Sequence, residues 1–465
     1  MAGFFFFRLP ELGYDLNIPN HENPIREWKS MSNTEYNLNQ GQKDAAEAFF
    51  SFLFDPSQKE FILSGPAGVG KTYWMGYIID EIMPRYHETC KFVGIDPEYD
   101  GVVMTATTNK AAEVLEYATG RPTQTIHSFL NLTVYEDYST GKMKLNKNPR
   151  TWTIHEKMII FVDECSMIDS PLYQMIHEGT LKCKIVYVGD HNQLAPVTEK
   201  LSPVYKQGSP MFTLTEQMRT SVPALMALNQ QLRDTVKTGI FNPIHEVPGF
   251  IEYLDDNDMQ KMLDITFCQQ TKGSRVLAYT NRRVIEFNDY IRQMRKLPDS
   301  FQAGEILVNN SAIKLGKGKS LSVESEVTIR SNRGPTQIEI DSGIMLAVEN
   351  LDFTSHLGEM FNHVPVPTDR AHFDALIKYY KRQKNWERYF YLKQNFPDLR
   401  PRDAATVHKS QGSTYDSVFV DLGNISSCHQ ADQAARMLYV AFSRAKHKVY
   451  IFGDLAAKYG GFIRA

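Results

Sequence analysis

The sequence predicts an α/β protein with two similar parallel-sheet lobes, for two reasons. From residue 42 onward short apolar strands alternate with helical stretches, which is typical of a parallel sheet covered by helices. Three apolar strands with polar ends also recur in the same order: residues 102–109, 159–164 and 184–190 are matched by residues 276–281, 418–422 and 448–454. One such match is weak, because apolar strands resemble one another, but an ordered set of three indicates two related lobes.

Composition narrows the class of protein. The 465 residues are enough for about three domains, and 42% hydrophobic with 23% charged residues is typical of a folded chain. Five cysteines without a Cys-x-x-Cys pair argue against a disulfide scaffold, a zinc ribbon or a redox motif, and favour a reducing cytoplasm. No apolar run approaches the ~18 residues of a membrane span. The net charge of −3 does not decide for or against a nucleic-acid partner, because a local basic channel can exist within an acidic total.

Segments outside the repeat are predicted to be an extension and two insertions. Residues 1–40 show no periodicity and read as an irregular N-terminal extension. A short inset at 133–148 predicts a β-hairpin that closes at residues 139–141. The second lobe carries a longer insertion, in which residues 304–351 alternate Val, Ile, Thr and Ser with Gly and Asn turns and predict a small β-barrel. Residues 372–396 then read as helical, basic and aromatic.

A glycine-rich segment predicts a nucleotide site. The apolar strand 59–64 leads directly into GPAGVGKT, a complete G-x-x-x-x-G-K-T, and a helix-compatible stretch follows at 73–83. Glycines let backbone N–H groups surround a pyrophosphate, Lys71 neutralises the outer phosphates and the Thr72 hydroxyl can bind Mg²⁺. The alternative, a glycine-rich turn without a ligand, is disfavoured by the flanking strand and helix. The predicted cofactors are ATP and Mg²⁺, and the predicted loop residues are Gly65, Ala67, Gly68, Val69, Gly70, Lys71 and Thr72.

Two carboxylates are predicted to complete an ATP-hydrolysing site. The apolar strand 159–162 ends in Asp163 and Glu164, at the carboxyl edge of the sheet where α/β proteins bind ligands. We assign Asp163 to Mg²⁺ and Glu164 to general-base activation of the attacking water. An Asp-Glu pair alone is usually a solvated strand end, and the preceding phosphate loop is what favours this assignment.

Five ordered motifs resemble those of superfamily 1 helicases: residues 65–72, 163–167, 189–194, 407–412 and 438–445. The resemblance is strongest to the RecD-like branch, superfamily 1B, and within it to phage accessory helicases, as residues 125–128 and 214–216 also indicate. It runs from about residue 38 to 453. The resemblance implies an ATP-dependent DNA helicase that moves 5′-to-3′ on single-stranded DNA and unwinds duplex in replication or recombination.

The resemblance also implies a domain plan of two tandem RecA-like lobes with an inserted β-hairpin and an inserted SH3-like β-barrel. Lobe 1A is expected at 41–222, with the hairpin, 1B, at 131–152. Lobe 2A is expected at 223–300 and 400–465. The barrel and the basic-aromatic helical segment, 2B, are expected at 301–399.

Four further residues receive roles from the resemblance. Gln42 corresponds to the adenine-reading glutamine, and Gln193 to the γ-phosphate sensor that couples hydrolysis to DNA. Arg444 and Arg219 correspond to the arginines that reach across the cleft to the γ-phosphate. A guanidinium from a moving lobe stabilises transition-state charge only when the cleft is shut. Without the motif context, each arginine is better explained as a surface ion pair.

Polar residues at the ends of the repeated strands predict a DNA track. A translocase grips a strand mostly by its phosphates, so that any sequence can pass. The alternative, helix capping, is common for such Thr and Asn residues and does not forbid DNA contact. In two places the sequence departs from the family: Thr107 replaces a usual proline, and Thr414 stands where some relatives have glutamate. The predicted DNA-binding residues are Thr107, Thr108, Asn109, Thr125, His127, Asn281, Thr406, His408 and Lys409.

The inserted hairpin corresponds to the wedge that splits the duplex in the family. Tyr135 and Tyr138 are predicted to stack on the fork base pair, and a surface turn without a role is the alternative. The expected partners are single-stranded and fork DNA, with a single-strand-binding protein or replisome components. The chain is expected to act as a monomer in the cytoplasm, that of a bacterial host if it is phage-encoded.

Two other functions stay open on the sequence: an RNA helicase on the same scaffold, and a nucleotide switch that binds a protein partner without translocating. The motifs at 408–412 and 438–445 weigh against a switch, which needs no second motor lobe.

Overall fold

The computed structural model describes residues 36–464, apart from 100, 138–141, 149, 197–198, 200, 207, 219, 312, 316–319, 322 and 356–357. Most of the predicted N-terminal extension, residues 1–35, therefore lies outside the described residues, as does the predicted hairpin turn at 139–141. In the part of the chain that the structure describes, no helix is long and apolar enough to cross a membrane.

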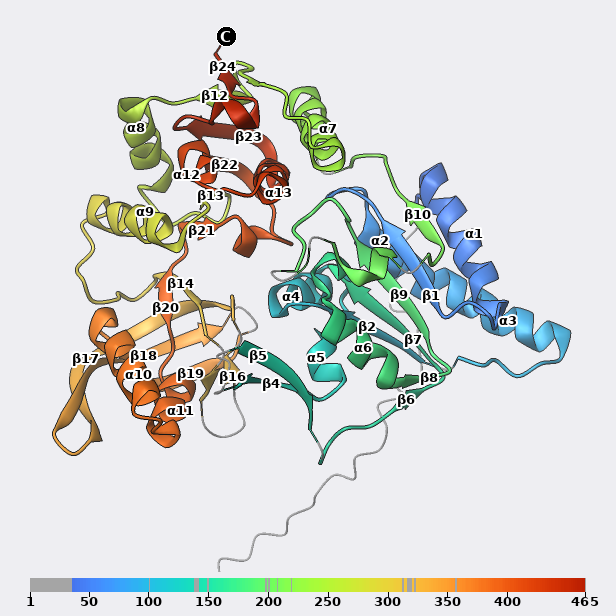
Figure 1. The fold of residues 1–465 in the computed structure, drawn as a ribbon, viewed down its shortest axis with the longest axis horizontal. Helices are drawn as coiled ribbons and strands as arrows, with labels where there is room; N and C mark the ends of the chain where they lie inside the picture. The colour runs from blue at the N-terminus through green and yellow to red at the C-terminus, as the bar shows by residue number, and fades with distance from the viewer. Residues whose placement is uncertain are drawn as a thin grey trace, which may run out of the picture. The chain divides into compact units, whose positions relative to one another are not determined.

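The first half of the chain forms a parallel sheet (Figure 1). Its strand order is β10-β1-β9-β7-β2-β3, and the neighbouring strands run in the same direction. Parallel strands need crossover connections, which the intervening helices supply. The strands are β1 (Glu60–Ser64), β2 (Gly101–Ala106), β3 (Thr123–Thr125), β7 (Met158–Asp163), β9 (Lys184–Gly189) and β10 (Met211–Thr213).

Both faces of this sheet are buried, which explains the unbroken apolar runs of its strands. In β1, Phe61 and Leu63 pack in the core formed with α1, α2 and α3, whereas Ile62 packs in a second core formed with α5 and α6. A short parallel pair, β6 (His155–Glu156) and β8 (Thr180–Leu181), accompanies the sheet. The helices are α1 (Gln40–Phe54), α2 (Lys71–Tyr77), α3 (Met83–Val93), α4 (Asn109–Thr119), α5 (Ile126–Phe129) and α6 (Ser170–Glu178), with the short 3-10 turns Cys165–Met167 and Pro203–Lys206.

The helix expected at 73–83 differs in one respect. It starts at Lys71 and continues to Val93, but five of its residues, Ile78–Ile82, form a π-helical turn between α2 and α3. Pro84 follows this turn, has no N–H to donate and crowds the carbonyl four residues earlier. A wider turn accommodates the proline ring without ending the helix.

The second half of the chain forms another parallel sheet, in the order β12-β23-β22-β13-β21. Val418 and Val420 of β22 pack towards α7, α12 and α13, and Phe419 packs on the opposite face towards α8 and α9. The strands are β12 (Ile251–Tyr253), β13 (Ser274–Ala278), β21 (Ala404–Thr406), β22 (Tyr415–Asp421) and β23 (Ala445–Phe452), with the short pair β11 (Ile244–His245) and β24 (Phe462–Ile463). The helices are α7 (Pro223–Thr238), α8 (Asp256–Phe267), α9 (Asn281–Met294), α12 (Leu422–Ser426) and α13 (Ala431–Phe442), with 3-10 turns at His408–Ser410 and Ala457–Tyr459.

The repeated strands occupy matching positions in the two sheets. The first sheet contains β9-β7-β2-β3 and the second contains β23-β22-β13-β21 in the same order. Beside β9 lies β1, which feeds the glycine-rich loop, whereas β12 holds the corresponding place beside β23. The predicted mixed α/β class with parallel sheets is confirmed, while the lobe boundaries stay a prediction.

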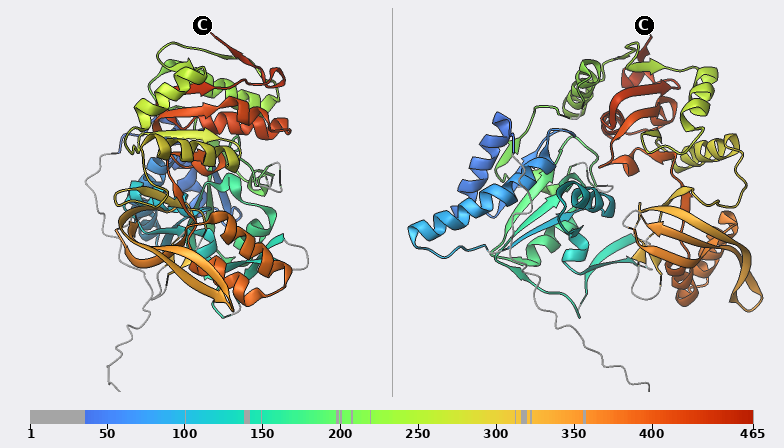
Figure 2. Two further views of the ribbon diagram at one scale, coloured as in Figure 1. Left: turned by 90° about the vertical axis from the view of Figure 1, so that its left-hand side faces the viewer. Right: turned by 180° about the vertical axis from the view of Figure 1, so that it is seen from behind.

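The insertion in the second half is an antiparallel sheet with two helices. The sheet has the order β19-β18-β17-β14-β20, and two of its strands, β19 and β20, lie beyond the predicted 304–351. Side chains of α10 and α11 pack with Leu346 and Val348 of β18, and Figure 2 shows these helices against the sheet. The SH3-like form of the insertion stays a prediction. The elements are β14 (Ile306–Asn309), β17 (Glu326–Asp341), β18 (Ile344–Ser355), β19 (Met360–Pro367), β20 (Leu399–Pro401), the pair β15 (Ile313–Lys314) and β16 (Ser320–Leu321), α10 (Arg370–Arg382) and α11 (Trp386–Asn395).

The short inset in the first half consists of two antiparallel strands, β4 (Leu132–Asp137) and β5 (Lys142–Lys147). Their pairing runs from Leu132 opposite Lys147 to Asp137 opposite Lys142. Tyr135 lies in β4, but its side chain, like all of Tyr138, lies outside the described residues.

Candidate active site

The glycine-rich loop joins β1 to α2 and depends on its glycines for space. Gly70 is the N-cap of α2 with φ 77°, and Gly68 has φ 88°, both in the left-handed region. A Cβ on Gly70 would lie 2.5 Å from Nε2 of Gln42, and one on Gly65 would lie 2.7 Å from the Leu214 carbonyl oxygen. Lys71 Nζ donates to the carbonyls of Gly65 and Pro66 at 2.8 and 3.0 Å. The loop therefore curls around its own lysine, at the positive end of α2.

Gln42 ties α1 to this loop. Its side chain is fully buried, and Nε2 donates to the Val69 carbonyl at 3.2 Å. Oε1 accepts from the Asn39 backbone N–H at 3.1 Å, which completes a capping box at the start of α1. The Gln42 carbonyl in turn accepts from Trp74 Nε1 at 3.1 Å. The structure thus places Gln42 against the loop, and its adenine-reading role stays a prediction.

Asp163 and Glu164 lie at the carboxyl end of β7, beside the loop. Burial, together with the neighbouring Glu164 carboxylate, raises the pKa of Asp163 to about 7, and Lys71 opposes the shift. Glu164 has φ 53°, a conformation that non-glycine residues adopt at a cost and that concentrates at functional sites. Its carbonyl accepts from Thr107 Oγ1 at 3.1 Å, so the residue that replaces the family proline helps to fix Glu164.

These groups border one cavity between the two sheets. Loop residues, Asp163 and Glu164 from the first sheet line it together with Thr414 and Arg444 from the second. Gln193 also borders the cavity. Ala67, Gly68, Gly70, Lys71 and Thr72 are the loop residues on its wall.

Arg444 reaches this cavity from the end of α13. The side chain is 1% exposed and donates to the carbonyls of Val440 and Ser413 at 3.1 and 3.3 Å and to Ser443 Oγ at 3.0 Å. Burial lowers the pKa of the Arg444 guanidinium, and the Glu164 carboxylate acts in the opposite direction. The structure therefore brings a buried cation of the second sheet to the carboxylates of the first.

Polar contacts between residues 190–193 and α13 join the two sheets beside this cavity. Tyr439 Oη donates to Asp190 Oδ2 at 2.7 Å, and both side chains are almost fully buried. Arg436 donates to the backbone carbonyls of His191, at 2.8 Å, and of Gln193. Asp190, Arg436 and Tyr439 were not predicted as site residues, although they lie in or beside two of the motif segments, because nothing in the sequence indicates which polar motif residues meet.

A metal ion has suitable oxygen donors here. Thr72 and Asp163 both border the cavity and offer the hard oxygen ligands that Mg²⁺ prefers. Among the described residues no three His, Cys, Asp or Glu side chains are grouped to hold a metal. A Mg²⁺ ion bound largely by phosphate oxygens and water needs only one or two protein ligands. The residues present therefore fit a metal that arrives with a nucleotide.

Several predicted DNA-binding residues cap helices or lie at their first turn. Thr108 Oγ1 accepts from Ala111 N–H at 3.2 Å and caps α4, and Thr125 Oγ1 accepts from Ser128 N–H at 3.1 Å and caps α5. Asn109 and Asn281 are the first residues of α4 and α9, which follow the matching strands β2 and β13. Capping is thus observed for both threonines, and helix N-termini at matching sheet positions suit phosphate oxygens.

Of the remaining predicted residues, His127 lies in α5 beside the first sheet, whereas Thr406, His408 and Lys409 lie at the end of β21 in the second. Burial lowers the pKa of both His127 and His408, with Asp169 opposing the shift of His127. Both imidazoles are therefore neutral near pH 7 and can act as hydrogen-bond partners rather than cations. Thr406 Oγ1 accepts from the Lys409 backbone N–H at 3.3 Å. Arg219 lies outside the described residues.

Two family models match the chain. One, described as an AAA domain, matches residues 37–246, and the other, described as a UvrD-like helicase C-terminal domain, matches residues 403–452. The first segment contains the glycine-rich loop, Asp163 and Glu164. The second contains Lys409 and Arg444.

Two relatives match this chain over nearly their whole length. The ATP-dependent DNA helicase Dda of Enterobacteria phage T4 is 26% identical, over 89% of this chain and 98% of the relative, in agreement with the motif resemblance to phage accessory helicases. An uncharacterized protein, R530, of Acanthamoeba polyphaga mimivirus is 23% identical over 89% and 99%. Among solved structures, a Pif1 helicase from Bacteroides in complex with ADP-AlF3 and single-stranded DNA is 14% identical, with a TM-score of 0.49 over 91% of this chain and 94% of that one.

Proposed function

The chain belongs to superfamily 1B of the helicases, with Dda among its relatives. We propose that it couples ATP hydrolysis to 5′-to-3′ movement along single-stranded DNA and unwinds duplex ahead of it. The observation that carries the proposal is the position of Arg444. This buried guanidinium belongs to the second sheet and borders the same cavity as the glycine-rich loop and Glu164 of the first. A nucleotide between them can therefore control the contact between the two lobes.

In the proposed chemistry, backbone N–H groups of the loop and Lys71 hold the phosphates, and Thr72 and Asp163 hold Mg²⁺. When bound, Mg²⁺ neutralises charge on the β- and γ-phosphate oxygens. Glu164 takes a proton from the attacking water, and Arg444, assisted by Arg219, stabilises the charge that develops on the γ-phosphate. Gln193 senses that phosphate. Its backbone contact with Arg436 supports a coupling role, because a shift of Gln193 pulls directly on α13.

In the proposed movement, DNA lies along the ends of the matching strands, and the two lobes hold it alternately. Asn109 and Asn281 at matching helix starts support equivalent grips in the two lobes. The further DNA ligands we propose are Thr107, Thr108, Thr125, His127, Thr406, His408 and Lys409. The β4–β5 hairpin, with Tyr135 and Tyr138, is proposed as the wedge.

The proposed domain plan is the RecA-like lobe 1A at 41–222 with insertion 1B at 131–152, lobe 2A at 223–300 and 400–465, and an SH3-like 2B at 301–399. The protein is proposed to act as a monomer in the cytoplasm on single-stranded and fork DNA, with single-strand-binding or replisome proteins as partners.

An unwinding assay with 5′-tailed and 3′-tailed duplexes tests polarity and helicase action together. We expect ATP-dependent unwinding of the 5′-tailed duplex and none of the 3′-tailed duplex. The reverse preference would show that the proposed direction is wrong. Separation of neither duplex would remove the helicase proposal.

ATPase rates with and without single-stranded DNA or RNA separate the two alternative functions. Stimulation by DNA supports the proposal, and stimulation by RNA alone favours an RNA helicase. If neither polymer stimulates hydrolysis, the motor proposal is wrong and the nucleotide switch becomes the favoured alternative.

A further inference from the structure

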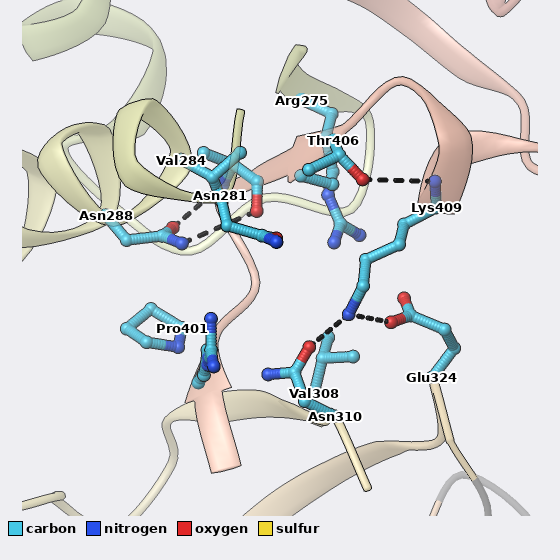
Figure 3. Close-up of a pocket in the computed structure, with 13 residues that line it drawn as sticks. Arg275, Asn281, Val284, Asn288, Val308, Asn310, Glu324, Pro401, Thr406 and Lys409 are labelled. Carbon is cyan, nitrogen blue, oxygen red and sulfur yellow. Dashed lines mark hydrogen bonds and ion pairs between the residues drawn. The ribbon is translucent and has the colours of Figure 1, made fainter. Parts of the chain in front are cut away.

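A second cleft lies where the second parallel sheet meets the inserted antiparallel sheet (Figure 3). From the parallel sheet and its helices come Arg275 of β13, Asn281 of α9 and Lys409, which follows β21. Asn310 and Glu324, on either side of the β15–β16 pair, come from the insertion. The cleft is separate from the nucleotide cavity and shares no lining residue with it.

Arg275 is the least expected residue of this cleft. Its side chain is 6% exposed, and its Nε has no hydrogen-bond partner among the described residues. In Figure 3 the guanidinium points into the cleft, towards the space between Asn281 and Lys409. The guanidinium lies 5.9 Å from the centre of the Tyr415 ring, but a buried N–H without an acceptor is still costly unless a ligand supplies one. The planar guanidinium fork suits phosphate oxygens.

Lys409 is a second cation in the cleft, and it forms an ion pair with Glu324. Lys409 Nζ lies 2.6 Å from Glu324 Oε1 and also donates to Asn310 Oδ1. Arg400 also lines the cleft, but Asp398 binds its guanidinium at 3.1 and 3.0 Å. Among the charged side chains that line the cleft, Arg275, Lys409 and Arg400 are positive and only Glu324 is negative. This excess of positive charge favours an anion such as a phosphodiester.

The backbone at Glu324 has a defined conformation, which positions its side chain. Its φ is 65°, a left-handed value that is strained for a non-glycine residue. The Glu324 N–H donates to the Asn309 carbonyl at 2.7 Å. The next two residues have partners as well: Ser325 donates to Glu113 of α4 at 3.2 Å, and Glu326 pairs with Arg402 at 2.8 Å. The turn at Glu324 thus holds the carboxylate oxygen Oε1 beside the ammonium group of Lys409.

We propose that this cleft binds one backbone phosphate of single-stranded DNA, with Arg275 as a ligand, and that Glu324 competes with that phosphate for Lys409. The inference rests on the proposed function and adds to it a ligand from outside the helicase motifs and an internal competitor. A carboxylate and a phosphate present similar oxygen acceptors to an ammonium group, so they can exchange at the same site. The competition weakens the grip of the second lobe, which a motor needs if it is to release the strand in each cycle.

The test is the dissociation constant of a fluorescein-labelled oligo-dT, measured by anisotropy at several salt concentrations. For Arg275→Gln we expect a roughly 10-fold weaker affinity, from the loss of one charge-assisted hydrogen bond. The slope of log K against log salt should also fall by about 0.7, the value for one phosphate contact on a single strand. The matched control is Arg330→Gln, an exposed arginine of the inserted sheet bonded to Thr354.

For Glu324→Gln the expected change has the opposite sign. The affinity should rise roughly 3- to 10-fold, because Lys409 no longer has a charged competitor. The control is Glu359→Gln, the same change at an exposed position of the inserted sheet. In a Lys409→Gln background the gain should vanish, because Glu324 acts through Lys409.

Two results would overturn the inference. The first is that Arg275→Gln keeps the affinity and the salt slope of the wild type. The second is that Glu324→Gln binds DNA no more tightly than the wild type while its melting temperature falls, because a purely structural ion pair would behave in this way. Arg275→Lys keeps the charge and covers the case in which Arg275→Gln fails to fold. Arg275→Lys should retain part of the affinity for oligo-dT and the full salt slope. The loss of both would also contradict the proposed site. If the wild type itself does not bind DNA, the proposed function fails instead, so the two failures are distinguishable.

Discussion

At the residue scale, Gly70 shows why the nucleotide loop needs glycine at this position. Its φ of 77° and the closeness of Gln42 leave no room for a side chain. The G-x-x-x-x-G-K-T pattern predicts the loop and its lysine, because the pattern describes local backbone geometry. The pattern could not predict that Gln42, 28 positions earlier, fills the space beside Gly70, because that contact depends on how α1 packs.

Gly70→Ala should weaken ATP binding at least 10-fold. The new Cβ would overlap Gln42 Nε2, and the left-handed conformation costs an alanine roughly 1–2 kcal/mol. The control is Gly120→Ala, also left-handed at φ 64° but with no atom within 4 Å of its Cβ. Binding of a fluorescent ATP analogue checks the comparison. If Gly70→Ala binds ATP as tightly as Gly120→Ala, the loop does not depend on the absence of a side chain at residue 70.

Glu164→Gln should bind ATP with near-normal affinity and lose roughly 10²–10⁴-fold in turnover, the usual contribution of a general base. Single-turnover hydrolysis with saturating single-stranded DNA is the measurement. Glu156→Gln, at an exposed position of β6, provides the control. Normal hydrolysis by Glu164→Gln would assign the base to another residue.

At the scale of elements, α4 contributes both a predicted DNA ligand at its first residue and a contact with the inserted sheet. Its first residue, Asn109, is a predicted DNA ligand, and Glu113 one turn later accepts from Ser325 Oγ at 3.2 Å in the insertion. Burial raises the pKa of Glu113 to about 7, with Lys110 and the Ser325 hydrogen bond opposing the shift. The sequence marked α4 as a helix after a repeated strand but could not reveal this contact, because the insertion lies about two hundred residues further along the chain.

Glu113 should make stability fall as the pH rises. Below its unfolded pKa of 4.5 both states are protonated and the group has no effect. Between 4.5 and about 7 the unfolded chain ionises first, so folding loses free energy, and above 7 the full cost of about 3 kcal/mol applies. Glu113→Gln keeps the acceptor for Ser325 without the charge, and should raise the melting temperature at pH 8.5 but not at pH 4.

Thermal unfolding at the two pH values is the measurement, with Glu116→Gln on the same helix as the control. If Glu113→Gln is no more stable than the wild type at pH 8.5, the buried carboxyl is not the source of the pH dependence.

For the whole molecule, the buried contact between Tyr439 and Asp190 joins the two sheets. Tyr439→Phe should cost roughly 1–3 kcal/mol, because it leaves a buried carboxylate with one donor fewer. DNA stimulation of the ATPase should decrease more than the DNA-free rate, since the contact links the nucleotide side to α13. Rates with and without oligo-dT measure this ratio.

Tyr459→Phe provides the comparison, because Tyr459 Oη donates at 2.5 Å to the Cys428 carbonyl within the second half of the chain. It removes a buried hydrogen bond without touching the first sheet. If the two variants lose DNA stimulation equally, the effect reports stability and not coupling between the sheets.

The alternation of strands and helices, the glycine-rich loop and the order of the repeated strands follow from the sequence alone, because each is encoded in neighbouring residues or in a short period. The family resemblance also predicted that Arg444 reaches the cleft, and Arg444 does border the cavity of Glu164. The contacts of Tyr439 with Asp190, and of Glu324 with Lys409 beside Arg275, became known only from the folded structure. The reason is that a side chain's partner depends on how whole elements pack, and no local pattern of residues specifies a contact between segments hundreds of positions apart.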